Sequence, residues 1–212
     1  MLSSRRTGWF VFAALTGAVL SVVVHAAEDA EQAPPDATIT AIWKVESIEF
    51  VYSSSTVRYT CEALRWRIAT ILQTVGAHSR MAIELSCSNV ERVNYANARI
   101  KLATPVEASE ENVRAATDYD TRDELVARLQ HKELASAEDI QRFPATWRTV
   151  ALTRTPPLSL GPGDCDLLRA MRDQVFPRLR VRVVSNGLNC GGGPDTRITP
   201  RIRVNALMPS RT

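Results

Sequence analysis

Four cysteines carry the clearest chemistry in this chain of 212 residues. Cys61 and Cys87 are 26 residues apart, and Cys165 and Cys190 are 25 apart. A thiol at the start of a helix has a lowered pKa, but redox sites are usually built from a Cys-x-x-Cys pair, which this sequence lacks. Only two histidines follow residue 26, too few for a zinc site with such widely spaced cysteines. We therefore expect no metal and no cofactor.

The N-terminal stretch indicates export, and export decides what the cysteines do. Arg5 and Arg6 precede an apolar run over residues 9–24, and Val-His-Ala at 24–26 suits signal-peptide cleavage. We expect residues 1–26 to be a signal peptide and the protein to be periplasmic or secreted. The alternative is an uncleaved N-terminal membrane anchor, which is less favoured because a span needs roughly 20 apolar residues. In an oxidising compartment the cysteines are expected to form disulfides.

The spacing of tryptophan and cysteine indicates that one unit occurs twice. Trp43 precedes Cys61 by 18 residues, and Trp147 precedes Cys165 by the same number. Each of these cysteines follows a residue whose side-chain oxygen can cap a helix, and each opens an apolar stripe of helical period. Four cysteines allow three pairings, and a repeat selects the one that lies within each unit. The predicted pairs are Cys61–Cys87 and Cys165–Cys190.

Each unit is predicted to contain a strand, a helix and two further strands. In the first unit, residues 39–105, these are a strand at 39–52, a helix at 61–75 between Thr60 and Gly76, and strands at 81–87 and 97–104. In the second unit, residues 147–212, they are a strand at 149–152, a helix capped by Asp164 and ended or kinked by Pro177, and strands at 181–184 and 198–206.

This pattern predicts an α+β fold of two tandem β-α-β-β repeats, an internal duplication in which each copy has one amphipathic helix and one disulfide. A helical connector joins the copies. Because each unit alone is small for a stable core, we expect both to share one sheet, with their helices on the same face, rather than to form two domains.

Two segments lie outside the units. Residues 27–38 are acidic and contain prolines, which predicts a disordered leader. Residues 106–146 have no counterpart in either unit and are predicted to form an acidic helical connector. Within it, Thr121 and Glu124 have the spacing of a capping box, and residues 136–143 are expected to form a short helix before a proline.

The charges are unevenly distributed between the connector and the second unit. The connector holds 5 basic and 10 acidic residues, a net charge of −5, whereas residues 147–212 hold 11 and 4, a net charge of +7. The candidate interaction residues are Arg178, Arg180, Arg182, Arg201 and Arg203. The first three would line one face only if their segment is extended.

Two interpretations of these arginines remain open. In the simpler one they pair with connector acids such as Asp123, Glu124 and Glu133. In the other they form a face that binds an anionic component of the cell envelope. Nothing in the sequence indicates a nucleic-acid partner.

Trp66 is the other candidate interaction residue. It lies on the side of its helix opposite the apolar stripe, between Arg65 and Arg67. We expect it either to pack beneath the connector helix or to be exposed as an aromatic contact for a protein partner.

Side chains with catalytic chemistry are sparse, and we predict no catalytic residue. Asp118 and Asp120 have the spacing of paired carboxylates, but they lie in an acidic connector where such pairs are usually solvated. Gly191–Gly193 does not stand between a strand and a helix, as a phosphate loop requires. The favoured function is that of an exported, non-enzymatic protein that binds a ligand or associates with the envelope. The alternative is a periplasmic hydrolase or a thiol redox enzyme.

Overall fold

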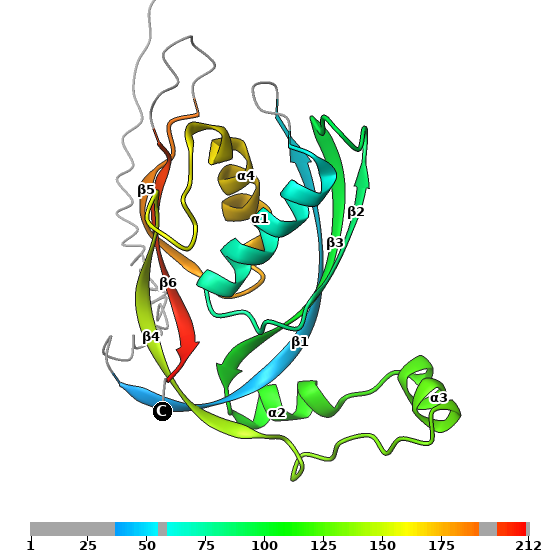
Figure 1. Cartoon of the computed structure of the whole chain (residues 1–212). Coiled ribbons are helices and arrows are strands. Elements are labelled where there is room, and N and C mark those ends of the chain that lie inside the picture. Colours follow the sequence, from blue (N-terminus) through cyan, green and yellow to red (C-terminus); the bar gives the residue numbers. More distant parts are fainter. Residues whose placement is uncertain (1–36, 55–58, 191–198, 211–212) are drawn as a thin grey trace, which may run out of the picture. The chain divides into compact units, whose positions relative to one another are not determined.

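One antiparallel sheet runs through both halves of the chain (Figure 1). The computed structural model describes residues 37–54, 59–190 and 199–210, which belong to one compact unit. The predicted signal peptide and most of the predicted leader lie outside the described residues.

The first half contains β1 (Thr38–Ser53), α1 (Cys61–Thr74), β2 (Ala82–Cys87) and β3 (Tyr95–Glu107). Two connecting helices follow, α2 (Glu110–Thr117) and α3 (Thr121–Leu129). The second half contains β4 (Arg142–Leu152), the 3-10 turn η1 (Pro162–Asp164), α4 (Cys165–Ala170), the π-helical turn η2 (Met171–Val175), β5 (Arg182–Gly187) and β6 (Arg201–Pro209).

The strand order is β2-β3-β1-β4-β6-β5, which places the two halves side by side. In the first half β1 and β2 run parallel to each other, with β3 antiparallel between them. In the second half β4 and β5 have the same relation to β6. The halves join where residues 38–42 of β1 pair with residues 142–146 of β4. The prediction of an α+β fold with one shared sheet is therefore confirmed.

α1 and α4 lie on the same face of this sheet, where they bury the main core (Figure 1). The apolar stripes predicted for both helices are buried there, with Leu64, Ile68, Ile71 and Leu72 from α1 and Leu168, Met171 and Val175 from α4 and η2. Strand residues of both half-sheets contribute to the same cluster. Because the core is shared, we expect neither half to be stable alone.

α1 begins and ends for the reasons that the sequence gives. The Thr60 hydroxyl caps it by accepting a hydrogen bond from the Ala63 N–H at 3.1 Å. Beyond the helix Gly76 has a φ of +95°, in the left-handed region that favours glycine. A Cβ at this position would lie 2.6 Å from the Leu207 carbonyl oxygen on β6. The predicted N-cap at Thr60 and helix end at Gly76 are confirmed. Because Gly76 has no side chain, it also allows the backbones of the two halves to lie close together.

The second helix differs from the prediction at its start. Asp164 does not cap it, because its carboxylate accepts the Gly161 N–H at 2.7 Å instead of an amide of the first turn. At its far end α4 widens into η2, where the Phe176 N–H donates to the Met171 carbonyl at 2.8 Å. Pro177 follows directly, so the predicted end of the helix is confirmed. The wider turn leaves Phe176 fully buried.

The sheet extends further into the predicted connector than the sequence pattern indicates. β3 continues to Glu107 and β4 begins at Arg142, so the short helix predicted at 136–143 is wrong. The physical reason is burial, since Phe143 packs in a small apolar cluster with Ile39 of β1. The other predicted strands agree with the structure to within three residues at each end.

The connector helices also differ from the prediction in detail. The cap of α3 is Asp120, which accepts the Asp123 N–H at 2.7 Å, so the capping box predicted at Thr121 and Glu124 is wrong. α2 is held against the sheet because Val113 is buried against residues of β1 and β3.

Both predicted disulfides are confirmed. Cys61–Cys87 joins the start of α1 to the end of β2, and Cys165–Cys190 joins the start of α4 to the segment after β5. Each therefore fastens the helix of one half to the strands of the same half.

Candidate functional site

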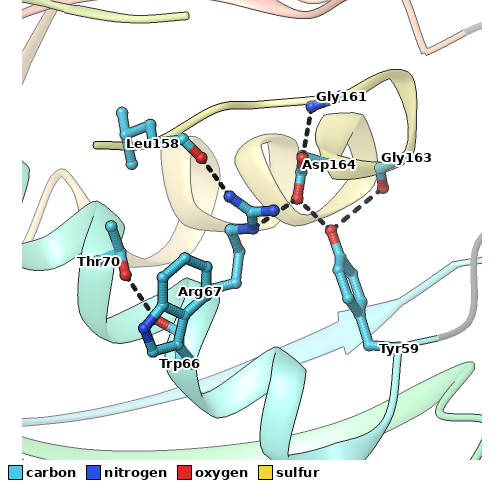
Figure 2. Close-up of polar contacts among 8 residues, drawn as sticks. All are labelled: Tyr59, Trp66, Arg67, Thr70, Leu158, Gly161, Gly163 and Asp164. Carbon is cyan, nitrogen blue, oxygen red and sulfur yellow. Dashed lines mark hydrogen bonds and ion pairs between the residues drawn. The ribbon is translucent and has the colours of Figure 1, made fainter. Parts of the chain in front are cut away.

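The acidic start of the second helix is held by side chains from the first half. Asp164 is 5% exposed at its side chain, and its carboxylate lies 3.0 Å from the Arg67 Nε of α1. The Tyr59 hydroxyl donates to the same carboxylate (Figure 2). The Gly161 N–H donates to the second carboxylate oxygen, which is why this aspartate is not available as a helix cap.

Arg67 makes two further contacts that fix it between the halves. Its guanidinium donates to the Leu158 carbonyl, in the loop between β4 and α4 (Figure 2). It also lies over the ring of its neighbour Trp66, 5.2 Å from the ring centroid. Nearby, the Ser54 hydroxyl donates to the Asp166 carboxylate at 2.8 Å, a second link from the first half to the start of α4.

Two tyrosines of this cluster have strongly shifted acidities. Burial raises the pKa of Tyr52 to about 12, with a smaller contribution from the negative charges of Asp166 and Asp164, and the hydrogen bond with Ser54 partly offsets this rise. Burial and the neighbouring Asp164 also raise the pKa of Tyr59 well above its ordinary value. Both phenols therefore stay neutral across physiological pH, and the Tyr59 hydroxyl acts as a hydrogen-bond donor.

This polar cluster joins the two halves through hydrogen bonds and an ion pair. The described members are two tyrosines, a serine, an arginine and two aspartates, and no histidine or lysine stands beside the serine as a base. Every charged member already has a partner of opposite charge or a hydrogen-bond donor. Its chemistry is that of an interface that fixes the relative position of the two halves.

Trp66 does not pack beneath the connector, contrary to the simpler expectation. Its side chain is 56% exposed, and the ring contact that the structure shows is with Arg67 of the same helix. The reason is that α2 occupies a different part of the sheet, against the joined ends of β1 and β3.

The outer face of the first half-sheet, opposite the main core, carries a balanced row of charges. Glu49, Arg99 and Glu84 lie directly opposite one another on β1, β3 and β2. The Arg99 Nε lies 2.8 Å from the Glu49 carboxylate, and its Nη1 lies 3.9 Å from that of Glu84. A hydrogen bond and the charge of Glu49 raise the pKa of Arg99. The arginine is therefore fully engaged by its neighbours.

These residues line an open groove of about 620 Å³. Gln174 of η2 also lines the groove, and its side-chain amide accepts the Val51 N–H at 2.9 Å and donates to the Val51 carbonyl at 3.0 Å. β4 pairs with β1 only as far as residue 42, so the edge of β1 is free beyond that residue. There the Gln174 amide makes the hydrogen bonds that a neighbouring strand would make. The groove is open and Arg99 within it is paired with both glutamates, so it offers little to orient a small ligand.

The outer face of the second half-sheet is different, because it presents arginines without acidic neighbours. Arg182 lies opposite Asn205, Ser185 opposite Arg203, and Gly187 opposite Arg201. Directly paired residues project to the same side, so the three arginines share one face, which we call the basic face. All three are exposed, whereas the alternate residues of β6 are buried in the main core.

No acidic side chain neutralises the basic face within the described part of the chain. The described acidic residues of the second half are Asp164, Asp166 and Asp173. They pair with Arg67, Arg169 and Arg172 respectively, on the helical side of the sheet. None of Arg182, Arg201 and Arg203 has an ion pair within 4.0 Å among the residues that the structure describes.

The five predicted arginines do not form one row. Arg178 and Arg180 lie in the turn after η2, where Arg180 has a φ of +56°, so the extended segment that would align them with Arg182 is absent. The reason is the proline that ends the helix, after which the chain turns back before β5.

The acidic connector does not neutralise these arginines either. Glu124 pairs with Arg128 of its own helix at 3.5 Å. In the described ranges, no ion pair joins Asp123, Glu124 or Glu133 to an arginine of the second half. Internal pairing, the simpler interpretation, is therefore not seen within 4.0 Å between these described residues.

Some conventional sites are not found in the described residues. No group of three His, Cys, Asp or Glu side chains is close enough to hold a metal ion. All four cysteines are in disulfides. None of the helices in the described ranges is long and apolar enough to cross a membrane.

Sequence reasoning did not identify the polar cluster. Tyr59 and Arg67 are separated from Asp164 by about a hundred positions, and nothing local marks them as its partners. The available signal was the position of Asp164 before a helix, which led to the prediction of a cap.

Comparisons of the chain with protein-family models, with curated proteins and with solved structures found no match. Its function therefore has to be inferred from the geometry described above.

Proposed function

We propose that this protein is an exported, non-enzymatic binding protein that attaches to phosphate groups of the cell envelope through its basic face. Two disulfides are compatible with an extracellular protein. The observation that carries the proposal is the set of three exposed arginines on β5 and β6 that has no acidic partner among the described residues.

Arginine chemistry and strand geometry favour a phosphate-bearing surface. A guanidinium group presents several donors in a plane and binds phosphate through two hydrogen bonds at once. Arg201 and Arg203 are alternate residues of one strand and so project to the same side roughly 7 Å apart, with Arg182 on the next strand. Such an array contacts several phosphates together, and a rigid sheet holds it in place.

The test is binding to vesicles of phosphatidylglycerol in phosphatidylcholine. We expect binding at about 50 mM salt that weakens strongly at about 300 mM, because screening shortens the reach of each charge. R201Q/R203Q should lower the affinity roughly thirtyfold, at about 1 kcal/mol for each arginine near an anionic surface. Circular dichroism and the unfolding midpoint should be unchanged, since both side chains are exposed.

The matched control is R99Q/K101Q, which removes two positive charges from the corresponding strand of the first half. Arg99 is already engaged by two glutamates, so this variant should keep most of the binding. Equal losses in the two variants, or binding that is unchanged at high salt, would contradict the proposal. Binding to heparin without binding to the vesicles would assign the face to a sulfated glycan instead.

We further infer that the two halves arose by duplication of one β-α-β-β unit. The repeated strand arrangement, the equivalent disulfides and the equal spacing of tryptophan and cysteine support this. The prediction is that the four elements of one half superpose on those of the other in the same order. A superposition limited to a single strand pair would contradict it.

Export itself is part of the proposal. Cleavage after Ala26 is supported by the apolar run and the small residues before it. The intact mass of the protein from the periplasm or medium should correspond to a chain that begins at Ala27. A full-length protein that stays with the membranes after a high-salt wash would favour the anchor.

A further inference from the structure

A small cavity lies where the two halves meet, apart from the groove and the basic face. Its volume is about 70 Å³. Most of its wall is apolar and comes from segments that are far apart in the chain, namely Ile39, Val75, Pro105, Val106, Trp147, Leu179, Val181 and Leu207. The polar residues of the lining are Thr104, Glu107 and Arg180. Sites for small molecules have this composition, with apolar walls and a few polar groups that orient the ligand.

The wall of this cavity is held by backbone contacts of both halves. Trp147 and Leu207 are directly paired residues of β4 and β6. The turn that carries Leu179 is fixed because the Val181 N–H donates to the Phe176 carbonyl at 3.0 Å. A cavity with such walls is preformed, so a ligand does not have to order them when it binds.

The volume limits the size of the apolar group that can enter. An engineered apolar cavity of about 150 Å³ holds one benzene molecule. The cavity at the join is about half as large, which suits a branched aliphatic group of about three or four carbons and not an aromatic ring.

Two residues of opposite charge lie at the rim of the cavity. Glu107 and Arg180 are both exposed, whereas the apolar residues of the wall are buried or half-buried. Neither has an ion pair within 4.0 Å among the residues that the structure describes, so they do not neutralise each other. A ligand with a single charge would meet a like charge at this rim. A ligand that carries an ammonium group and a carboxylate can pair with both residues.

Thr104 adds a neutral hydrogen-bonding group to the lining. The residue is 5% exposed, and its side chain has no hydrogen bond among the described residues. Within the same ranges the one side-chain oxygen that is both sealed from solvent and unpartnered belongs to Ser210, so the Thr104 hydroxyl opens on the cavity that it lines. A hydroxyl in this position is available to a polar group of a ligand.

We propose that this cavity binds a free α-amino acid with a small branched aliphatic side chain, such as leucine or valine. The side chain of the ligand fills the apolar space. Its carboxylate pairs with Arg180, and its ammonium group pairs with Glu107. The site does not use the arginines of the basic face, so it is independent of attachment to phosphate groups.

The first test is an NMR titration of the protein with L-leucine up to about 10 mM, following the methyl groups of Val75, Leu179 and Leu207. We expect saturable shifts at these methyl groups, with a dissociation constant on the order of 0.1–1 mM for so small a ligand. Isocaproate lacks the ammonium group of leucine and isopentylamine lacks its carboxylate, so each should bind about tenfold more weakly. Alanine should also bind about tenfold more weakly, because its methyl group leaves the cavity unfilled.

The second test uses exposed residues of the rim, which can be changed without disturbing the core. R180Q should weaken leucine binding about tenfold, whereas the matched control R178Q, in the same turn, should bind like the wild type. E107Q should weaken binding to a similar extent, with E111Q on α2 as its control. T104V keeps the volume of the side chain and should weaken binding about fivefold through the lost hydroxyl.

The proposal would be overturned by any of three results. The first is an absence of shifts at the three methyl groups with leucine, as expected if the cavity holds only water. The second is an equal loss of binding in R180Q and R178Q. The third is isocaproate or isopentylamine binding as tightly as leucine, which would show that the rim does not recognise both charges of an amino acid.

Discussion

The two halves of this protein share an arrangement but differ in how they treat charge. In the first half, the outer face balances Arg99 between Glu49 and Glu84. In the second half, Arg201 and Arg203 lie on the corresponding strand without an acidic partner among the described residues. The strand framework is thus compatible with a neutral face and with a basic one, and the difference lies in side chains that do not contribute to the core.

The halves also differ in how regular they are. α1 is a continuous helix of 14 residues, whereas the second helix has six α-helical residues between a 3-10 turn and a π turn. β2 pairs with β3 in continuous register, whereas the pairing of β5 with β6 is interrupted by an irregularity between Val183 and Ser185. We therefore expect the structure of the first half to be the more stable of the two. The order of the second half should depend on its contacts with the first.

The strongest test of that dependence is Arg67→Met. Arg67 is the partner of Asp164, which would keep its charge in a site where its side chain is 5% exposed. Removing one partner of a buried ion pair leaves the other uncompensated, so we expect a loss of about 4 kcal/mol in the free energy of unfolding. Chemical denaturation measures it.

The control for Arg67→Met is Arg65→Met on the same helix. Arg65 pairs with Glu62 at 2.7 Å in solvent, within the first half alone. It should change the free energy of unfolding very little. Similar losses in the two variants would mean that the contact between the halves is no stronger than a surface ion pair.

The disulfides give the next largest expected effect. Each closes a loop of about 25 residues, so removing either by paired Cys→Ala substitution should cost about 3 kcal/mol through the entropy of the unfolded chain. If the second half depends on the first, the Cys61–Cys87 variant should lose order in both halves. The Cys165–Cys190 variant should lose it first around α4, and hydrogen exchange distinguishes these outcomes.

Gly76→Ala tests the close approach of the Gly76 backbone in the first half to the Leu207 backbone in the second half. The substitution places a Cβ 2.6 Å from the Leu207 carbonyl of β6 at a residue whose φ is +95°. Strain at the left-handed position and displacement of β6 together should cost roughly 2–3 kcal/mol. The control glycine is Gly161, which precedes the helix of the second half and where an added Cβ lies 3.8 Å from the Asp164 carboxylate. Gly161→Ala should therefore be tolerated.

The sequence could predict what is local or periodic. The helix stripe with Leu64 and Ile68 and the stop at Gly76 follow from spacing and backbone preference, and the disulfides follow from equal spacing in the two units. The link from Arg67 to Asp164 joins distant segments, so it could not be read from either one. The basic face was predicted only in part, because a turn, not a strand, carries Arg178 and Arg180.

The smallest expected effect is a loss of stability at high pH that comes from tyrosines of the first half. All four tyrosines of the chain precede residue 120, so an alkaline effect from buried phenols comes from the first half. Burial raises the pKa of Tyr52 to about 12 in the folded protein, from 10 in its ordinary state. The folded protein keeps this proton to higher pH than the unfolded chain. The resulting stabilisation is therefore complete below about pH 10 and is lost as pH rises toward 12.

The test is the pH dependence of the urea midpoint in Tyr52→Phe. The wild type should lose up to roughly 2 kcal/mol between pH 10 and 12 through this group. Tyr52→Phe has no phenol to ionise at this position, so its stability should fall less steeply over the same interval, although it loses about 1 kcal/mol at neutral pH with the hydroxyl's hydrogen bond. Tyr95→Phe, on the exposed face of β3, is the control and should follow the wild type. Parallel curves for wild type and Tyr52→Phe would show that the loss of stability at high pH arises from other groups. The contribution of Tyr52 to the first half would then be its packing and not its ionisation.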